Sequence, residues 1–247
     1  MGLTPFEMSI AALAAIVVGF SKTGITGSGI LVVPVLAGLV GPKQSVGLLL
    51  PMLILADVFG VAYHRKNADW RLLGRLLPWV LPGIVIGYVV LGRISNTAMG
   101  PVLAVLVLDI VALRVAQERG GAWLNEHVPN TGWFSAFMGM AAGFATMVGN
   151  CAGSIMAVYL LSMRFDKRRF MGTAVWYFLL INLIKVPFSA HRGLITVEGL
   201  WFDLKAAPFV ALGAVLGILV FNRISQVWFS RVILILAALA ALRLLVL

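Results

Sequence analysis

Two stretches of small and polar residues interrupt long apolar sequence, and their residue types suit anion binding. The first reads GFSKTGITGSG at residues 19–29 and the second GFATMVGNCAGS at residues 143–154. Glycine lets backbone approach a ligand closely, and a helix that begins after such a break offers unpaired N–H groups and a partial positive charge. Two such helix N-termini that face each other would surround an oxyanion with donors.

Side chains at the two breaks add hydrogen-bond donors, and Lys22 adds a cation that can neutralise a bound anion. The candidate substrate-binding residues are Ser21, Lys22, Thr23, Gly24, Thr26, Gly27, Ser28, Gly29, Gly149, Asn150, Cys151, Gly153 and Ser154. Two of them have an alternative interpretation. Lys22 lies close enough to a segment end to extend to the membrane interface, and Cys151 is either a reactive thiol or simply a small packing residue.

Three further polar residues lie inside apolar segments and are candidates for coupling or gating. Asp57 lies twelve residues into its segment, where an unpaired carboxylate is costly, so it either pairs with Lys22 or Lys185 or carries a proton or ion. Asn182 and Lys185 are three residues apart, which places them on one helix face near the repeat position of Asp57. Lys185 is close to its segment end and is equally compatible with an interfacial anchor.

Composition places the chain in the membrane class. Of its 247 residues, 61% are apolar and 11% are charged, and the mean hydropathy is +1.03, which excludes a water-soluble fold. The 19 basic residues lie between apolar runs rather than in one patch, which favours topology signals over nucleic acid binding. A single cysteine and three histidines without ligand spacing predict no metal site, and we expect no cofactor.

Apolar runs predict helices, because barrel strands would alternate polar and apolar residues. The ten runs cover residues 6–20, 28–40, 45–63, 76–92, 97–113, 132–148, 151–163, 170–190, 204–221 and 227–247. We expect the first run to be retained in the membrane, because it lacks a positive leader region and a cleavage site. The first two runs of each half are predicted to be too short to cross, and to meet as half-helices inside the membrane.

Landmark residues recur at fixed displacements and indicate an internal repeat. Gly19-Phe20 recurs 124 positions later, and Pro78, Gly83 and Gly87 recur 130 positions later. The GxxxG pairs at 83–87, 139–143 and 213–217 favour close helix packing. We predict a first repeat at residues 1–115, a cytoplasmic linker at 116–130 and a second repeat at 131–247.

Basic residues predict the orientation when each pair of short runs enters and leaves on one side. Five basic residues then lie on one side of the membrane and twelve on the other, and we expect the side with twelve to be cytoplasmic. The twelve are Arg65, Lys66, Arg71, Arg75, Arg114, Arg119, Arg164, Lys167, Arg168, Arg169, Arg223 and Arg231. The repeats would then be inverted and both termini non-cytoplasmic. If each pair is instead one broken crossing, the charges divide evenly and predict no orientation.

The fold class is therefore predicted as an all-α polytopic membrane protein. It consists of two inverted repeats, each with a broken or re-entrant helix pair and three transmembrane helices. Such repeats are typical of transporters that bind substrate near the membrane midplane.

At these residues the chain resembles the sulfite exporter TauE/SafE family of permeases. The segment Gly19–Gly24 with Gly27, Gly29 and Pro34 is similar to its N-terminal motif, and Lys43–Gly47 with Pro51 and Asp57 is similar to its next segment. The resemblance spans both halves, although the second break lacks the Lys-Thr-Gly of the first.

The resemblance implies a permease of the cell inner membrane for sulfite, a sulfonate such as sulfoacetate, or a related organosulfur anion. We expect no enzymatic activity, a bilayer environment and alternating access. A homodimer and a monomer are equally compatible with the packing glycines. Two alternatives stay open from the residues: an anion channel, and a membrane sulfur-relay protein that uses Cys151.

Overall fold

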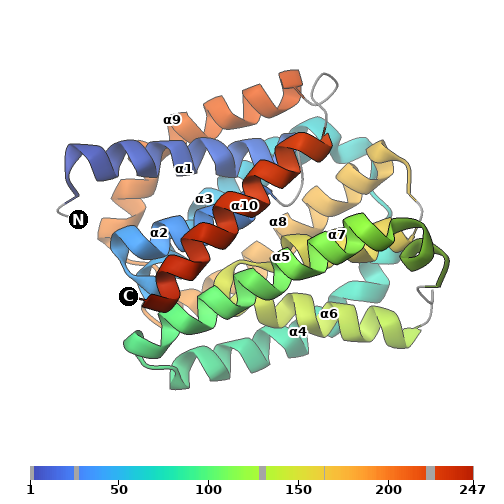
Figure 1. Ribbon diagram of the computed structural model, residues 1–247, viewed down its shortest axis with the longest axis horizontal. Helices are drawn as coiled ribbons and strands as arrows, with labels where there is room; N and C mark the ends of the chain where they lie inside the picture. The colour runs from blue at the N-terminus through green and yellow to red at the C-terminus, as the bar shows by residue number, and fades with distance from the viewer. Residues whose placement is uncertain (1–2, 25–27, 128–131, 164, 221–225, 247) are drawn as a thin grey trace.

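Helices make up every regular element that the structure describes (Figure 1). The structure is a computed structural model, and it describes residues 3–24, 28–127, 132–163, 165–220 and 226–246. The elements are α1 (Pro5–Thr23), η1 (Ser28–Leu31), α2 (Val32–Val40), α3 (Pro42–His64), η2 (Arg65–Asn67), α4 (Trp70–Arg93), α5 (Asn96–His127), α6 (Gly132–Gly149), α7 (Ala152–Ser162), α8 (Lys167–His191), α9 (Val197–Val220) and α10 (Gln226–Val246). The predicted all-α membrane fold is confirmed.

Local capping fixes where several helices begin. Thr4 caps α1 and forms a reciprocal capping box with Glu7. Asp69 accepts an amide hydrogen bond at the start of α4, and Asp166 accepts two at the start of α8. Asp69 and Asp166 lie in the polar connections that precede α4 and α8, so their caps mark where these two helices begin.

The prediction that the first run of each half is short is wrong for α1. Five of the described helices are long and apolar enough to cross a membrane, and α1 is one of them. Its 19 residues span about 28 Å, because the polar residues after Gly19 continue the helix. Ser21 and Thr23 both find acceptors inside the protein, at Val18 and Ala214. The second runs are short, with 9 residues in α2 and 11 in α7.

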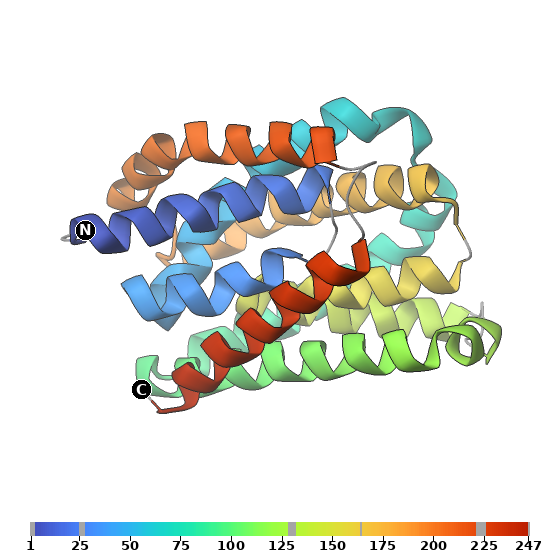
Figure 2. The same cartoon turned by 45° about the horizontal axis from the view of Figure 1, so that its top comes forward.

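The chain turns back after α1, so that α2 runs toward the end of the bundle where α1 began (Figure 2). The last described residues of α10 also lie at that end (Figures 1 and 2). By contrast, α6 begins at the opposite end from α1 (Figure 1). These opposite directions are what an inverted repeat requires.

Glycines bring the two halves into contact at two equivalent crossings, α1 with α9 and α6 with α4. A Cβ added at Gly19 would lie 2.0 Å from the Val210 carbonyl oxygen, and one at Gly143 would lie 2.2 Å from that of Val80. Gly143 is the repeat counterpart of Gly19, and Val80 is that of Val210. The packing role that we predicted for the GxxxG glycines at 83–87, 139–143 and 213–217 is confirmed, because a Cβ at any of them would lie within 2.8 Å of the facing helix.

Neither half buries its helices alone, since each crossing pairs one helix from each predicted repeat. The predicted boundary between the repeats stays a prediction. Helix α5 extends to His127, so most of the predicted linker at 116–130 is helical. Residues 128–131 lie outside the described part of the chain.

An ion pair joins the two halves at the end where η2 and α8 meet. The Arg169 guanidinium contacts the Asp69 carboxylate, and the Thr173 hydroxyl accepts a hydrogen bond of 2.9 Å from the Asp69 amide. Partial burial acts to raise the pKa of the Asp69 carboxyl, but amide donors and Arg169 outweigh this and hold its pKa below the usual range. The carboxylate therefore stays charged, and its ion pair connects the segment before α4 with the start of α8.

We expect Gly83→Ala to destabilise the protein, because a Cβ there would lie 2.2 Å from the Met140 carbonyl oxygen and would push α4 from α6. Overpacking of this kind costs about 1–3 kcal/mol, and thermal unfolding in detergent measures it. Gly74→Ala on the same helix is the matched control, because nothing lies within 4 Å of its Cβ position. Equal unfolding temperatures for the two variants would contradict the tight crossing.

Candidate functional site

A buried ion pair lies where the first break meets α3. The Lys22 Nζ near the end of α1 is 2.8 Å from Asp57 Oδ1 in α3, and the Asp57 side chain is completely buried. The Asn182 amide of α8 donates to Asp57 Oδ2 at 2.7 Å. One cation and one amide thus compensate a carboxylate that would otherwise be costly inside the membrane.

Lys22 has a second neighbour, the aromatic ring of Phe178. Its Nζ lies 4.0 Å from the ring centroid, which is the geometry of a cation–π contact. Phe178 and Asn182 are four residues apart, so one face of α8 contacts both members of the ion pair. Because α1, α3 and α8 all hold Lys22 in place, we infer that it does not extend to the interface.

A second polar network centres on Lys185 at the other break. The Lys185 Nζ donates to the Thr146 hydroxyl at 3.2 Å and to the Asn150 amide oxygen. Asn150 has φ of 55°, a left-handed conformation that Asn tolerates better than most residues, and it donates to the Val46 carbonyl at 3.0 Å. Lys185 is 1% exposed, so we infer that its side chain is held inside the protein rather than at an interface.

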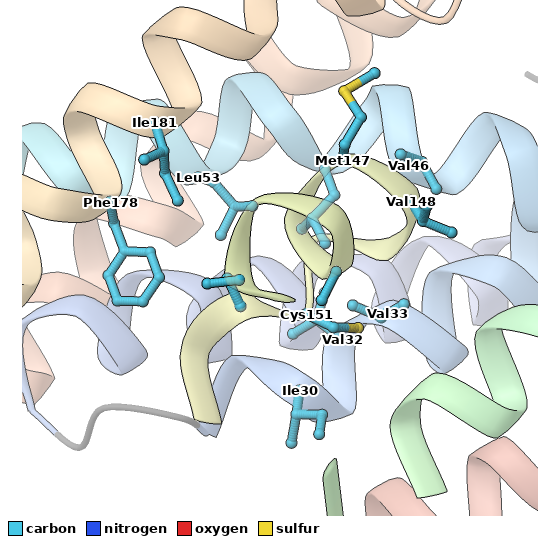
Figure 3. Close-up of a cluster of buried hydrophobic side chains, with 14 of the residues drawn as sticks. Ile30, Val32, Val33, Val46, Leu53, Met147, Val148, Cys151, Phe178 and Ile181 are labelled. Atoms are coloured by element: carbon cyan, nitrogen blue, oxygen red, sulfur yellow. The ribbon is translucent and has the colours of Figure 1, made fainter. Parts of the chain in front are cut away.

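A cavity of about 50 Å³ lies between the two networks. It is lined by Ser21, Lys22, Gly29, Ile30, Leu49, Leu53, Thr146, Asn150, Cys151, Gly153, Ala174, Val175, Phe178 and Asn182. Figure 3 shows apolar members of this lining, Ile30, Leu53, Cys151 and Phe178, which come from four separate segments of the chain. The structure therefore brings the two breaks together around one space, which is larger than a single water needs.

Charge in this region does not cancel. Lys22 and Asp57 neutralise each other, whereas the partners of Lys185 among the described residues, Thr146 and Asn150, are neutral. With both lysines protonated, the cluster carries one net positive charge in a low-dielectric interior. Coulomb attraction to an anion is several times stronger there than in water.

The predicted site residues divide into three groups. Those that line the cavity are Ser21, Lys22, Gly29, Asn150, Cys151, Gly153 and Asn182. Those that the structure describes outside the lining are Thr23, Gly24, Ser28, Asp57, Gly149 and Lys185. Thr26, Gly27 and the Ser154 side chain lie outside what the structure describes.

Three of the residues outside the lining pack helices together. Thr23 donates at 2.8 Å to the Ala214 carbonyl of α9, and a Cβ at Gly24 would lie 3.0 Å from Gly217 Cα. A Cβ at Gly149 would lie 2.8 Å from a methyl carbon of Leu103. These positions shape the breaks without reaching the cavity.

Backbone donors differ between the two breaks. The amides of Asn150 and Cys151 donate back to carbonyls of α6, so they are not available to a ligand. Helix α7 begins at Ala152, and the amides of its first turn have no acceptor within the helix. In the first half a short 3-10 turn, η1, follows the break in place of an α-helix N-terminus.

Sequence reasoning missed Thr146 and Phe178 as lining residues. Phe178 lies on the face of α8 that also carries Asn182 and Lys185, four and seven residues further along. Extending that face by one turn would have found it. Thr146 is inside the second break, but its role depends on Lys185, which is 39 positions away in the sequence.

We expect Asp57→Asn and Lys22→Met each to cost about 3–5 kcal/mol of stability, because each leaves a buried partner uncompensated. The double variant should recover most of that loss, since it removes both charges and keeps an acceptor for Asn182. Thermal unfolding of the four proteins measures the coupling. The same cycle on the Asp69–Arg169 pair, whose arginine is exposed, should give under about 1 kcal/mol. Additive losses at Lys22 and Asp57 would contradict a compensated pair.

Comparison with known proteins gives one match. The model of the family described as sulfite exporter TauE/SafE matches residues 11–244. No curated protein and no solved structure gives a significant match. The match covers both breaks, the ion pair and both helix crossings. The chain belongs to the sulfite exporter TauE/SafE family of membrane transporters.

Proposed function

We propose that the protein is a permease that moves a small sulfur-containing oxyanion across the cell inner membrane by alternating access. The observation that carries this proposal is the cavity between the two breaks, with Lys22 in its wall and Lys185 immediately behind it. The family supports a sulfur anion as the substrate class. The net positive charge of the cluster supports an anion on physical grounds.

Lys22 is the group that we assign to direct contact with the anion. Asp57 holds its ammonium from one side, and Lys22 lines the cavity. An ammonium has three donors, so it can bind an oxyanion without releasing Asp57. The second amide hydrogen of Asn150 and the first-turn amides of α7 supply neutral donors on the other sides.

Lys185 acts through Asn150 and not by contact. Its hydrogen bonds to Thr146 and Asn150 hold the second break in the left-handed turn. Its charge adds to the attraction that an anion experiences in the cavity. Substitution of Lys185 therefore removes long-range attraction and loosens the turn at once.

Cavity size favours a compact substrate in this conformation. A space of about 50 Å³ exceeds the 10–15 Å³ that one water requires by a few times only. An oxyanion with a single sulfur and no carbon chain fits this space best. A longer sulfonate requires the cavity to widen.

Helix crossings define the parts that move in this proposal. The α1–α9 and α4–α6 pairs are locked by glycine contacts, whereas the cavity lies where α1, α3, α7 and α8 meet. We assign alternating access to movement between the two locked pairs. The cavity then opens toward one side at a time.

Cys151 favours one second candidate, a sulfur relay, because it lines the same cavity. Its Sγ is buried and lies 3.0 Å from the Gly149 carbonyl. Cys151→Ser separates the two functions. A relay loses all activity in this variant, whereas the proposed permease keeps its anion binding.

Anion binding is tested by thermal unfolding with sulfite, sulfate, thiosulfate, sulfoacetate, isethionate, taurine and chloride. At about 100 times its dissociation constant a ligand adds roughly 2.7 kcal/mol of stability, which corresponds to about 5–11 °C for a chain of this size. We expect sulfite to give the largest shift. The Lys22→Met/Asp57→Asn variant should lose it, and Lys205→Met, at an exposed position on α9, should keep it. No shift with any of the anions would contradict the proposed site.

Orientation is tested by labelling with a membrane-impermeant maleimide in a Cys151→Ser background. Lys66→Cys and Thr97→Cys place exposed thiols at η2 and at the start of α5, beyond opposite ends of α4. We expect only the Thr97→Cys protein to be labelled in intact cells, because the basic end is assigned to the cytoplasm. Labelling of Lys66→Cys alone would reverse the orientation.

A further inference from the structure

A second cavity of about 210 Å³ lies against the first half of α3, between that helix and the segment that leads into α9. Gly47 and Pro51 of α3 line it, together with Leu194 and Asp203. The first cavity is lined by Leu49 and Leu53 of the same helix. The two cavities therefore contact different faces of α3, and the second is not part of the anion site.

Asp203 of α9 is an acidic residue in the wall of this cavity that has no partner. It is 9% exposed, and neither carboxylate oxygen has a hydrogen-bond partner among the described residues. A carboxylate that is buried in this way without a partner is one of the costliest arrangements in a membrane protein. A bound proton removes that cost, because it removes the charge.

Two other charged residues line the same cavity as Asp203. They are Lys43 of α3 and Glu198 of α9. Among the described residues Lys43 makes no ion pair with Asp203, and Glu198 is itself acidic. Lys205 is on the same helix and is exposed. The positive charge of Lys43 opposes a metal cation in this space, whereas a proton on the carboxyl group is neutral once bound.

Backbone carbonyls offer acceptors for that proton. Pro51 has no amide hydrogen, so the Gly47 carbonyl lacks the helical donor four residues on. The Leu194 carbonyl packs directly against Gly47, where a Cβ would lie 1.9 Å from its oxygen. The cavity wall therefore combines a carboxyl group with carbonyl oxygens.

Helix α9 links this cavity to the anion site. The α1–α9 crossing locks Gly19 and Gly213 against backbone of the opposite helix, and α1 ends at Lys22 and Thr23. A change in the position of α9 is therefore transmitted to Lys22. The repeat counterpart of Asp203 in α4 is Leu73, so the carboxyl group occurs in the second half alone.

We propose that Asp203 is the proton-binding group through which a proton gradient drives transport. The carboxylate takes one proton from a hydronium ion and leaves water, and in another conformation it returns that proton to water. The coupling role rests on the proposed function, whereas proton binding at Asp203 stands independently of it.

Proton binding is tested by thermal unfolding of wild type and Asp203→Asn from about pH 5 to about pH 9 in choline buffer without substrate. A group that holds its proton in the folded state contributes stability at low pH and loses it as pH rises. We expect the difference between the two unfolding temperatures to be smallest at the acid end and to grow as pH rises. At the alkaline end Asp203→Asn should unfold at least about 3 °C higher than wild type.

Glu198→Gln is the matched control, since Glu198 lines the same cavity, and it should keep the wild-type profile. A constant difference between wild type and Asp203→Asn at every pH would overturn proton binding. If sodium raised the unfolding temperature of wild type alone at the alkaline end, proton binding would be overturned as well, because a metal cation would then be the ligand.

Coupling is tested with radiolabelled sulfite in proteoliposomes that carry a pH gradient. We expect the gradient to accelerate uptake at least threefold in wild type and to have no effect in Asp203→Asn, which should keep downhill exchange. Equal acceleration in both proteins would overturn the coupling role. If neither protein moves sulfite while the pH dependence of unfolding persists, the permease proposal fails and proton binding stands.

Discussion

The cost of charge inside a membrane is the constraint on which the rest of this structure depends. Three ionisable side chains, Lys22, Asp57 and Lys185, lie together where the two halves meet, and each is at least nine-tenths buried. Such a cluster persists only if each charge has partners. Asp57 has an ammonium and an amide, whereas the partners of Lys185 among the described residues are neutral acceptors. In the function that we propose, the resulting excess of positive charge attracts the anion.

Close helix packing positions that cluster. The crossings of α1 with α9 and of α6 with α4 use Gly19 and Gly143, which recur in the sequence, so each half packs closely against the other. If these helices stood further apart, the end of α1 and the turn after α6 would not border one cavity. The glycines away from the cavity thus matter for function because they position the glycines and polar residues that line it.

Local patterns in the sequence were sufficient to predict the helical membrane fold, whereas the inverted repeat and the two breaks stay predictions. Apolar runs and recurring Gly19 and Gly143 contain that information directly. The sequence also narrowed the partners of Asp57 to two lysines, of which Lys22 is the one in contact. It misplaced the end of α1, where the Thr23 hydroxyl bonds to the Ala214 carbonyl, 191 positions away in the sequence. Asp203 was missed for a similar reason, since its burial depends on packing against α3.

Lys185 gives the most direct test of the account, because its unpaired charge is what makes the cluster positive. Equilibrium binding of radiolabelled sulfite to protein in nanodiscs can be compared between wild type, Lys185→Met and Lys205→Met. The account predicts at least about a tenfold weaker affinity for Lys185→Met, since loss of a nearby unit charge in a partly screened interior removes on the order of 1–4 kcal/mol of Coulomb attraction, and unchanged affinity for Lys205→Met. Wild-type affinity in Lys185→Met would contradict an anion site built on buried positive charge.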